Sequence, residues 1–283
     1  MTSRPLDEPL HFSSHEYDEF CAFLQSSCGI DLGHNKQYLV ATRVRRIMVS
    51  LNLTKLAQLT ELIKKADQRQ VRQSVIDAMT TNETFWFRDN YPFEYFGTKL
   101  LPRIQAQKPG SSIKIWSAAC SYGQEPYSLS MVVEEFNKRP AAKPLAVDIL
   151  ATDLSSAVLE HARTGVYDRI SIARGLTPDR KSQFFEAVDE DNWRLKSSVK
   201  HRVQFRPLNL QDSFYLLGKF DVIFCRNVLI YFSQELKAEI LRKLHGQLHT
   251  GGFLFLGSSE GLTGVAELFE MVDCAPGLAY KAV

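Results

Sequence analysis

The sequence contains few cysteines, and their number and spacing argue against two common ways of stabilising a fold. There are five, with no Cys-x-x-Cys pair among them: Cys21, Cys28, Cys120, Cys225 and Cys274. An odd, scattered set predicts neither a disulfide framework nor a zinc site. No apolar run approaches the roughly 20 residues of a membrane span, and the N-terminal residues lack the apolar core of a signal peptide. We therefore expect a cytoplasmic protein in a reducing compartment, without a metal.

The chain also lacks a large net charge. Its formal charge is +2 over 283 residues, too small to indicate a polyanionic partner such as nucleic acid. The charge is nevertheless uneven, because residues 33–75 contain nine basic and two acidic residues. This stretch predicts a basic surface, which is either simply solvated or a docking face for an acidic partner.

The first eighty residues predict an all-helical domain. Ser13 or Ser14 can cap a first helix, whose apolar residues recur at spacings of three and four and which ends near Gly29. A second helix, with a 3.6-residue apolar period, brings Arg43 and Arg46 together beside its apolar face. Two further amphipathic helices complete this domain, which we place at residues 1–80.

From about Tyr91 onward, helical and strand patterns alternate, which is typical of an α/β fold with a parallel sheet. Apolar runs predict strands at 113–117, 146–152, 203–207, 220–227, 253–256 and 278–283. The pair Gly251-Gly252 is expected to end the last long helix. The alternation fails after Asp168, so a small antiparallel sheet is expected as an insertion at about 168–205 of a domain spanning 91–283.

Residues 113–126 read as a strand, a loop of small residues and the start of a helix at about Gln124. A ligand can lie against such a backbone, where the helix N-terminus offers free N–H groups. Only Gly123 of this loop is glycine, so the Gly-x-Gly-x-x-Gly pattern of a dinucleotide site is absent. Glu125 would repel a phosphate but accepts a hydrogen bond from an ammonium group, which S-adenosylmethionine has. The competing interpretation is a tight turn with a favourable first-turn acid.

Polar residues follow the other predicted strands at the same edge of the sheet. Asp153 sits just past the end of the second strand, where an acid binds ribose hydroxyls in doubly wound folds, or instead caps the next helix. Asn209 and Leu210 follow the third strand at the height of an adenine ring, and Asn227 follows the fourth. The carboxyl ends of parallel strands meet at one edge, so these residues predict a single site.

The linker at 81–90 joins polar residues to three consecutive aromatic residues, at positions 85–87. Three adjacent aromatic side chains cannot all face one core, so at least one packs elsewhere, against a flat ligand or against the neighbouring domain. Arg88 beyond them is able to hold a carboxylate by two parallel hydrogen bonds.

Five segments together resemble the CheR family, the chemotaxis receptor glutamate O-methyltransferases. They are Thr81-Asn-Glu-Thr-Phe-Trp-Phe-Arg88, Trp116-Ser-Ala-Ala-Cys-Ser-Tyr-Gly-Gln-Glu-Pro-Tyr-Ser128, Ala151-Thr-Asp153, Phe224-Cys-Arg-Asn-Val-Leu-Ile-Tyr-Phe232 and Phe255-Leu-Gly-Ser-Ser-Glu260. The resemblance implies a Rossmann-like class I methyltransferase sheet, an N-terminal all-helical domain, a linker and an inserted antiparallel β-subdomain.

The resemblance also implies a site and a partner. Matching positions assign S-adenosylmethionine to Asn82, Thr84, Arg88, Glu125, Asp153, Asn209, Leu210, Arg226 and Asn227, with S-adenosylhomocysteine as the product. Tyr231 matches the family's active-site tyrosine, and Arg88 and Tyr231 are the expected catalytic residues. The implied partners are methyl-accepting chemotaxis receptors in membrane clusters, with Arg43 and Arg46 as the docking residues. The competing interpretations are a methyltransferase acting on nucleic acid, a small molecule or another acidic protein, and a non-catalytic S-adenosylmethionine sensor.

Some family members bind a receptor tail peptide through a glycine-containing extension of the inserted subdomain. The stretch from Phe184 to Phe205 contains no glycine here. We therefore expect this chain to act without a receptor tail peptide.

Overall fold

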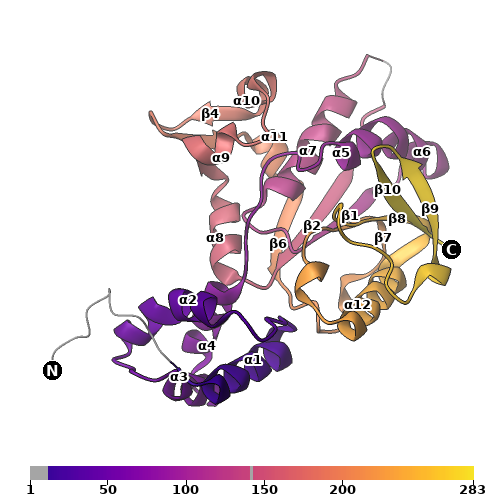
Figure 1. Cartoon of the computed structure of the whole chain (residues 1–283). Helices are drawn as coiled ribbons and strands as arrows, with labels where there is room; N and C mark the ends of the chain where they lie inside the picture. The colour runs from indigo at the N-terminus through magenta and orange to yellow at the C-terminus, as the bar shows by residue number, and fades with distance from the viewer. Residues whose placement is uncertain (1–11, 141–142) are drawn as a thin grey trace.

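The computed structural model describes residues 12–140 and 143–283, and the first eleven residues of the predicted helical domain lie outside that range. Four helices form a separate body at the N-terminal end, beside the larger α/β body (Figure 1). They are α1 (Ser14–Cys28), α2 (Gln37–Ser50), α3 (Leu56–Lys64) and α4 (Arg69–Met79). Their inward faces share one apolar core, as the helical periodicity predicts.

Local sequence signals set the ends of the first helix. The Ser13 side chain accepts a hydrogen bond from the Glu16 N–H, and Glu16 accepts one from the Ser13 N–H in return. This reciprocal pair satisfies two N–H groups that the helix itself leaves unpaired. Gly29 ends the helix in the left-handed conformation, at a φ of 76°.

The α/β body is built on a seven-stranded sheet in the order β6-β2-β1-β7-β8-β10-β9. The first five of these strands run parallel, and β10 runs antiparallel to both of its neighbours, β8 and β9. The strands are β1 (Ile113–Ala118), β2 (Val147–Asp153), β6 (Val203–Pro207), β7 (Phe220–Cys225), β8 (Leu248–Phe255), β9 (Phe269–Cys274) and β10 (Gly277–Ala282). This is the predicted Rossmann-like methyltransferase sheet.

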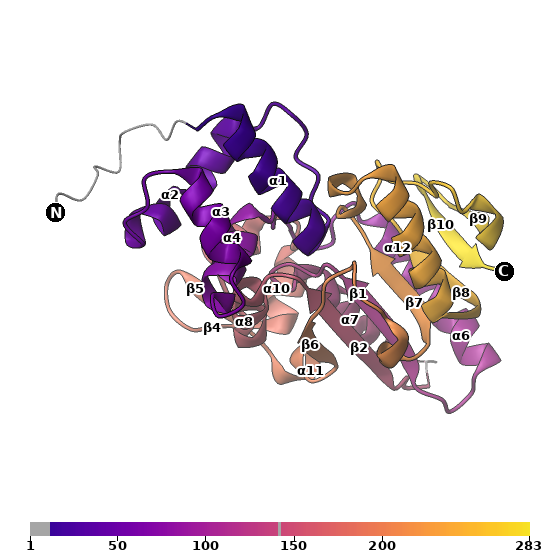
Figure 2. The same ribbon diagram turned by 90° about the horizontal axis from the view of Figure 1, so that it is seen from below.

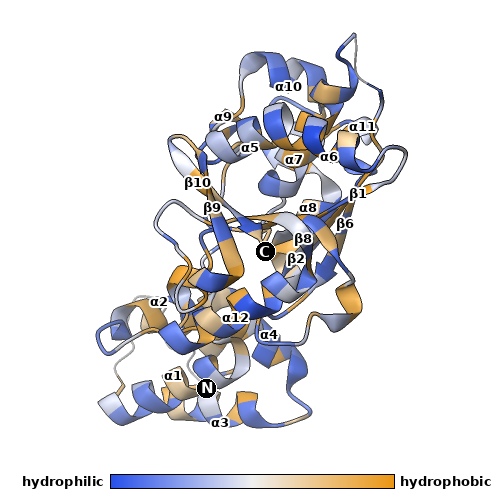
Figure 3. Cartoon of the chain, turned by 90° about the vertical axis from the view of Figure 1, so that its right-hand side faces the viewer, coloured by the Kyte–Doolittle hydropathy of each residue, from blue (hydrophilic) through white to orange (hydrophobic). Residues whose placement is uncertain are grey.

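Helices cover both faces of the sheet, so two apolar cores form. Val222 and Phe224 of β7 point into one core and Ile223 and Cys225 into the other, because side chains alternate along a strand. Figure 2 shows α12 on one side and α7 on the other, and Figure 3 shows hydrophobic residues along the strands between them. The covering helical segments are α5 (Tyr91–Tyr95), η1 (Phe96–Leu100), α6 (Leu101–Gln107), α7 (Gln124–Asn137), α8 (Ser156–Thr164) and α12 (Gln234–Gln247), and the short turns are η2 (Tyr215–Leu217), η3 (Leu229–Tyr231) and η4 (Ala266–Leu268).

The expected insertion is a three-stranded antiparallel sheet in the order β3-β5-β4. It lies at the opposite end of α8 from the helical domain (Figure 1). Its elements are β3 (Val166–Asp168), α9 (Arg169–Ala173), α10 (Pro178–Phe184), β4 (Phe185–Ala187), β5 (Asn192–Leu195) and α11 (Ser197–Lys200).

One prediction near the C-terminus is wrong, and one strand there was not predicted. Gly251 and Gly252 do not end a helix, since α12 stops at Gln247 and β8 runs through both glycines. A Cβ on Gly252 would lie 3.0 Å from the carbonyl oxygen of Asp221, so glycine allows β8 to approach β7 at an irregular register. Strand β9 was missed because its exposed side chains do not alternate with buried ones.

Candidate active site

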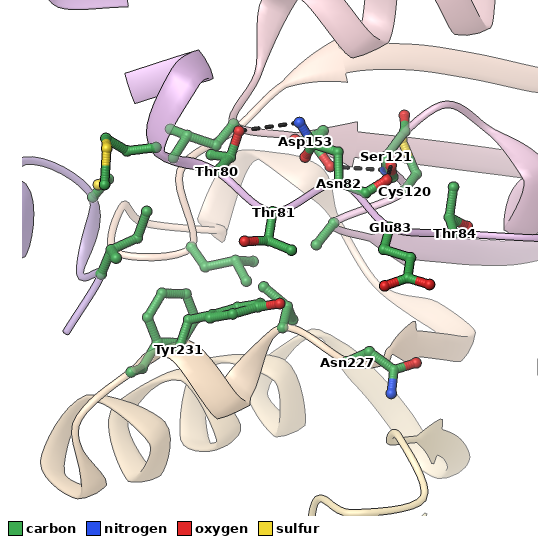
Figure 4. Close-up of a pocket in the computed structure, with 18 of the residues that line it drawn as sticks. Thr80, Thr81, Asn82, Glu83, Thr84, Cys120, Ser121, Asp153, Asn227 and Tyr231 are labelled. Carbon is green, nitrogen blue, oxygen red and sulfur yellow. Dashed lines mark hydrogen bonds between the residues drawn. The ribbon is translucent and has the colours of Figure 1, made fainter. Parts of the chain in front are cut away.

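One cavity opens between the helical domain, the linker and the carboxyl ends of the central strands. Its lining includes every residue predicted to hold the cofactor or the substrate: Asn82, Thr84, Arg88, Glu125, Asp153, Asn209, Leu210, Arg226, Asn227 and Tyr231. The linker forms one side of the cavity, and Asn227 and Tyr231 lie across from it (Figure 4). Residues far apart in the sequence therefore meet at the predicted edge of the sheet.

The turn after β1 contributes backbone rather than side chains. Ala119 and Ser121 line the cavity and adopt positive φ values of 61° and 51°, which strains residues other than glycine. Such strain is typical of loops shaped for a ligand. Gly123 does not line the cavity, and a Cβ added to it would lie 3.0 Å from the Ala162 Cβ and 3.2 Å from the Tyr167 hydroxyl. Its small size serves packing between helices rather than close approach of a ligand.

Asp153 is buried at the end of β2 with both carboxylate oxygens engaged. One oxygen accepts a hydrogen bond from the Ser121 N–H at 2.8 Å, and the other accepts one from the Ser155 N–H at 2.9 Å. Each oxygen has a second lone pair for a ligand hydroxyl. Ser155, not Asp153, caps helix α8, so the competing capping interpretation fails.

Glu125 is held from two sides at the start of α7. Its Oε1 accepts a hydrogen bond from Ser117 Oγ at 2.8 Å, and its Oε2 pairs with Arg226 Nη1 at 3.1 Å. Arg226 in turn donates to Asp89 Oδ2 at 2.7 Å, and its side chain is 1% exposed. This geometry makes Arg226 a support that fixes Glu125 and ties the linker to β7. Direct contact between Arg226 and the cofactor stays a prediction.

The three aromatic residues of the linker divide as expected. Trp86 and Phe87 are buried, and the Trp86 ring packs edge-on against Tyr167 of the insertion at 4.8 Å. Phe85 lines the cavity instead. The guanidinium groups of Arg88 and Arg174 lie 5.5 Å and 5.4 Å from the Phe85 ring centroid. The linker therefore contacts both the ligand cavity and the neighbouring subdomain.

The helical domain supplies one wall of the cavity, which the sequence reasoning did not anticipate. The wall consists of Cys28, Ile30, Asp31, Leu32, Lys36, Leu39 and Arg43. It is tied to the sheet domain where Asn209 Nδ2 donates to the Ser27 carbonyl at 2.8 Å and the Asp31 N–H donates to the Tyr231 carbonyl at 2.8 Å. The sequence signal that could have indicated this wall is the pair of apolar residues Ile30 and Leu32, which follow the first helix and belong to no predicted helix.

Arg43 and Arg46 do not share one free surface. Arg46 is exposed, whereas Arg43 donates to the carbonyl oxygens of Met79 and Thr80 at 2.6 Å and 3.2 Å. Arg43 also lines the cavity, and burial lowers the pKa of its guanidinium. It therefore joins α2 to the start of the linker. The role of both residues in partner binding stays a prediction.

The cavity fits S-adenosylmethionine better than a nucleotide. Two carboxylates, Glu125 and Asp153, suit an ammonium group and ribose hydroxyls, and a cluster of acids would repel a pyrophosphate. Leu210, Val228 and Phe232 supply apolar surface for an adenine ring. Arg88 also lines the cavity, and its pairing with the carboxylate of the amino acid moiety stays a prediction.

Two kinds of feature are absent from residues 12–140 and 143–283. No helix there is long and apolar enough to cross a membrane. In the same residues, no group of three or more His, Cys, Asp or Glu side chains is arranged to hold a metal ion.

Comparisons with known proteins agree with this geometry. Residues 82–278 match the CheR methyltransferase SAM-binding domain, and residues 15–80 match the CheR methyltransferase all-alpha domain. The chain is 46% identical over 268 residues to the chemotaxis protein methyltransferase Cher2 of Pseudomonas putida, covering 94% of this chain and 98% of that protein. It is 49% identical over 270 residues to chemotaxis protein methyltransferase 1 of Vibrio cholerae, covering 95% and 97%.

Both domains match in the order and at the positions that the fold shows. The boundary between the two matches falls between residues 80 and 82, where the linker begins. With this coverage, the chain belongs to the CheR methyltransferase family, and residues 82–278 are its S-adenosylmethionine-binding domain.

Proposed function

We propose that this protein methylates glutamate side chains of chemotaxis receptors, with S-adenosylmethionine as the methyl donor and S-adenosylhomocysteine as the product. The observation that carries the proposal is one cavity that is lined by the two carboxylates Glu125 and Asp153 and also by Arg88 and Tyr231. The names of the relatives, chemotaxis protein methyltransferases, support the same substrate class.

The reaction needs little acid–base catalysis from the protein. A glutamate carboxylate, with a reference pKa of about 4.3, is already the nucleophile at neutral pH, so no general base is needed. Bound S-adenosylmethionine supplies an electrophilic methyl group on a sulfonium leaving group. The residues of the cavity must align the carboxylate with that methyl group and exclude water, a positioning effect of about 7–11 kcal/mol in favourable cases.

Arg88 and Tyr231 are the residues that we propose to orient the substrate carboxylate. Arg88 Nη1 already donates to the Glu83 carbonyl at 3.1 Å, and its guanidinium lies near the Phe85 ring. These contacts hold Arg88 at one edge of the cavity and limit how tightly it pairs with the substrate. A looser pair preserves the nucleophilicity of the carboxylate, so orientation by the Tyr231 hydroxyl becomes the more important contact.

The proposed partner is the helical methylation region of a membrane-bound receptor. An acidic helix suits the basic surface predicted for residues 33–75, on which Arg46 is exposed. The enzyme would then work in the cytoplasm and be recruited to receptor clusters at the membrane. No contact with nucleic acid is part of this proposal.

The test is methyl transfer to receptor-containing membranes from methyl-labelled S-adenosylmethionine. Glutamyl methyl esters release labelled methanol in base, whereas methylated amines retain the label. Tyr231→Phe should lower the transfer rate much more than the affinity for S-adenosylmethionine, because only a hydroxyl is removed. Tyr215→Phe is the control, since Tyr215 is 83% exposed and does not line the cavity. Binding of S-adenosylmethionine without any base-labile label would instead indicate a sensor or another substrate.

A further inference from the structure

Glu260 makes an unusual set of contacts behind the cavity. Its Oε2 accepts hydrogen bonds from the backbone N–H groups of Asn227 and Gly257, both at 2.7 Å. Its Oε1 accepts a third, longer one from the Ile230 N–H at 3.3 Å. A single carboxylate thus collects three backbone donors from two segments, and hydrogen bonds to a charged acceptor are stronger than those between neutral groups.

Two of these donors belong to the loop that carries the proposed reaction residues. Asn227 follows Arg226 just after β7 and has a φ of 59°, a strained conformation for a residue other than glycine. Tyr231 ends the three-residue turn η3, which is too short to pair all its own N–H groups. The Tyr231 N–H pairs within the turn, with the Val228 carbonyl at 3.2 Å, whereas the N–H groups of Asn227 and Ile230 use an acceptor from outside the loop. Glu260 is that acceptor for both Asn227 and Ile230.

The end of β8 is shaped to bring Glu260 close to this loop. A Cβ on Gly257 would lie 2.6 Å from Asn227 Nδ2, 2.7 Å from Glu260 Oε2 and 2.9 Å from Asn227 N. Only glycine fits between the carboxylate and the loop. The Glu260 N–H also donates to the Gly257 carbonyl at 2.9 Å, which closes a turn and directs the carboxylate back. This explains the pattern Gly257-Ser-Ser-Glu260, to which the proposed reaction gives no role.

Glu260 acts from behind the loop rather than from inside the cavity. It does not line the active-site cavity, and it lines a second cavity together with Asp89, Tyr91 and Tyr280. Asp89 holds Arg226 from the same side. The second cavity is therefore bordered by two acids that support active-site residues, and neither acid is placed to touch the reacting groups through it.

We infer that Glu260 is a positioning residue for methyl transfer, which sets the place of Asn227 and Tyr231 by holding the backbone of residues 227–230. This inference rests on the proposed function, because it assigns Glu260 to the same reaction. Loss of the carboxylate leaves the N–H groups of Asn227 and Ile230 without their acceptor, so that the Tyr231 hydroxyl no longer meets the substrate in one orientation. A misplacement of about 1 Å at a reacting group can cost about 100-fold in rate.

The experiment compares Glu260→Ala and Glu260→Gln with the wild-type chain in the receptor methylation assay, alone and combined with Tyr231→Phe. Glu260→Ala should lower kcat by about 100-fold and Glu260→Gln by about 10-fold, since the amide keeps one acceptor oxygen but lacks the charge. The receptor KM and the Kd of S-adenosylhomocysteine should change by only a few fold. Glu267→Gln, an exposed glutamate of the same C-terminal region, is the matched control.

The double variants separate positioning from a general structural role. If Glu260 acts through Tyr231, removing the carboxylate in the Tyr231→Phe background should cost much less than in the wild-type background. Equal losses in both backgrounds would overturn the inference, as would a wild-type kcat in Glu260→Ala. If Glu260→Ala fails to fold, Glu260→Gln decides the question by the same comparison. A wild-type chain that methylates no receptor would count against the proposed function instead.

Discussion

The two carboxylates in the cavity, Asp153 and Glu125, are held by different groups. Asp153 accepts two backbone hydrogen bonds, whereas Glu125 is paired with a serine hydroxyl and the buried Arg226 guanidinium. Both carboxylates are therefore fixed before any ligand arrives. Fixed acceptors lose little conformational entropy on binding, so each should contribute a large share of the affinity.

At the level of this single residue, Asp153→Ala should weaken binding of S-adenosylmethionine and S-adenosylhomocysteine alike. The expected loss is about 1.5–3 kcal/mol, because hydrogen bonds to a charged group are removed. Isothermal calorimetry with both ligands measures it. Asp148→Ala is the control, since Asp148 is an exposed acid on the same strand and lies outside the cavity. Unchanged affinity for both ligands in a folded Asp153→Ala protein would remove Asp153 from the site.

The two acids should also make the stability of the folded protein depend on pH. Burial raises the pKa of Glu125 above its ordinary 4.5, against the opposing effect of Arg226, and burial raises the pKa of Asp153 above its ordinary 3.8. Each group then binds a proton in the folded protein at a pH where the unfolded chain has released it. Their contribution to stability is therefore lost as the pH rises from those ordinary values through the raised pKa values.

Binding should show the opposite trend. An ammonium group and ribose hydroxyls are bound best by the charged carboxylates, so affinity for S-adenosylhomocysteine should fall as the pH drops through the raised pKa values of Glu125 and Asp153. Calorimetric titrations from neutral pH into the acidic range measure the effect. Glu125→Gln should bind more weakly at neutral pH and show a flatter pH profile. A Kd that stays constant down to the ordinary carboxyl range would contradict this expectation.

At the scale of secondary structure, the periodicity of apolar residues predicted the helices and strands that bury one face. The helical domain, the parallel strands and the caps at Ser13 and Ser233 follow from local spacing and side-chain chemistry. The path of β8 through Gly251 and Gly252 did not, because it depends on the close approach of β7. The site residues could be predicted because strand ends meet at one edge, but the wall formed by residues 28–43 depends on how two domains pack.

The sequence places Arg43 and Arg46 together on helix α2 and predicts the same docking role for both. In the structure the two arginines lie in different surroundings, so we now make a separate prediction for each. Arg46 is exposed, so Arg46→Glu should slow methylation of receptors and reduce its salt dependence without changing cofactor affinity. Arg103→Glu, the same charge change at an exposed site on α6 and outside residues 33–75, is the control. If Arg46→Glu methylates receptors at the wild-type rate in low salt, the basic surface of α2 is solvated and binds no receptor.

Arg43 should behave differently because it holds the start of the linker. Its guanidinium binds the carbonyl oxygens of Met79 and Thr80 and the hydroxyl of Thr81. Arg43→Ala should therefore weaken binding of S-adenosylhomocysteine, by loosening the segment that carries Asn82 and Thr84. Calorimetry on Arg43→Ala beside Arg46→Glu tests this difference, and equal cofactor affinities in the two variants would refute it.

At the scale of the whole molecule, the inserted subdomain is part of the active-site structure. The backbone N–H of Trp86 donates to the Arg174 carbonyl at 3.1 Å, and a Cβ on Gly175 would lie 2.0 Å from the Trp86 carbonyl oxygen. The Trp86 ring also packs against Phe185 at 5.3 Å. The subdomain thus presses on the linker that lines the cavity, and this contact gives it a structural role without any peptide ligand.

The edges of the subdomain offer little to an added strand. Both outer strands, β3 and β4, are three residues long, so few backbone groups are free for a peptide to pair with. The only ring that marks β5, Trp193, is covered by Lys181 Nζ at 3.7 Å from its centroid. Together with the absence of glycine from Phe184 to Phe205, this geometry favours an enzyme that engages receptors directly.

Receptors with and without their C-terminal tails should therefore be methylated at the same rate. A tether raises the local concentration of an enzyme around its substrate, and an enzyme that uses none gains nothing from the tail. Initial rates on matched full-length and tail-truncated receptors in the same membranes measure this. The contrary outcome is a faster rate on the full-length receptor, together with micromolar binding of the tail peptide in calorimetry. Loss of that binding on changing Trp193 or Arg194 would then locate the peptide on β5 and overturn the direct mode of engagement.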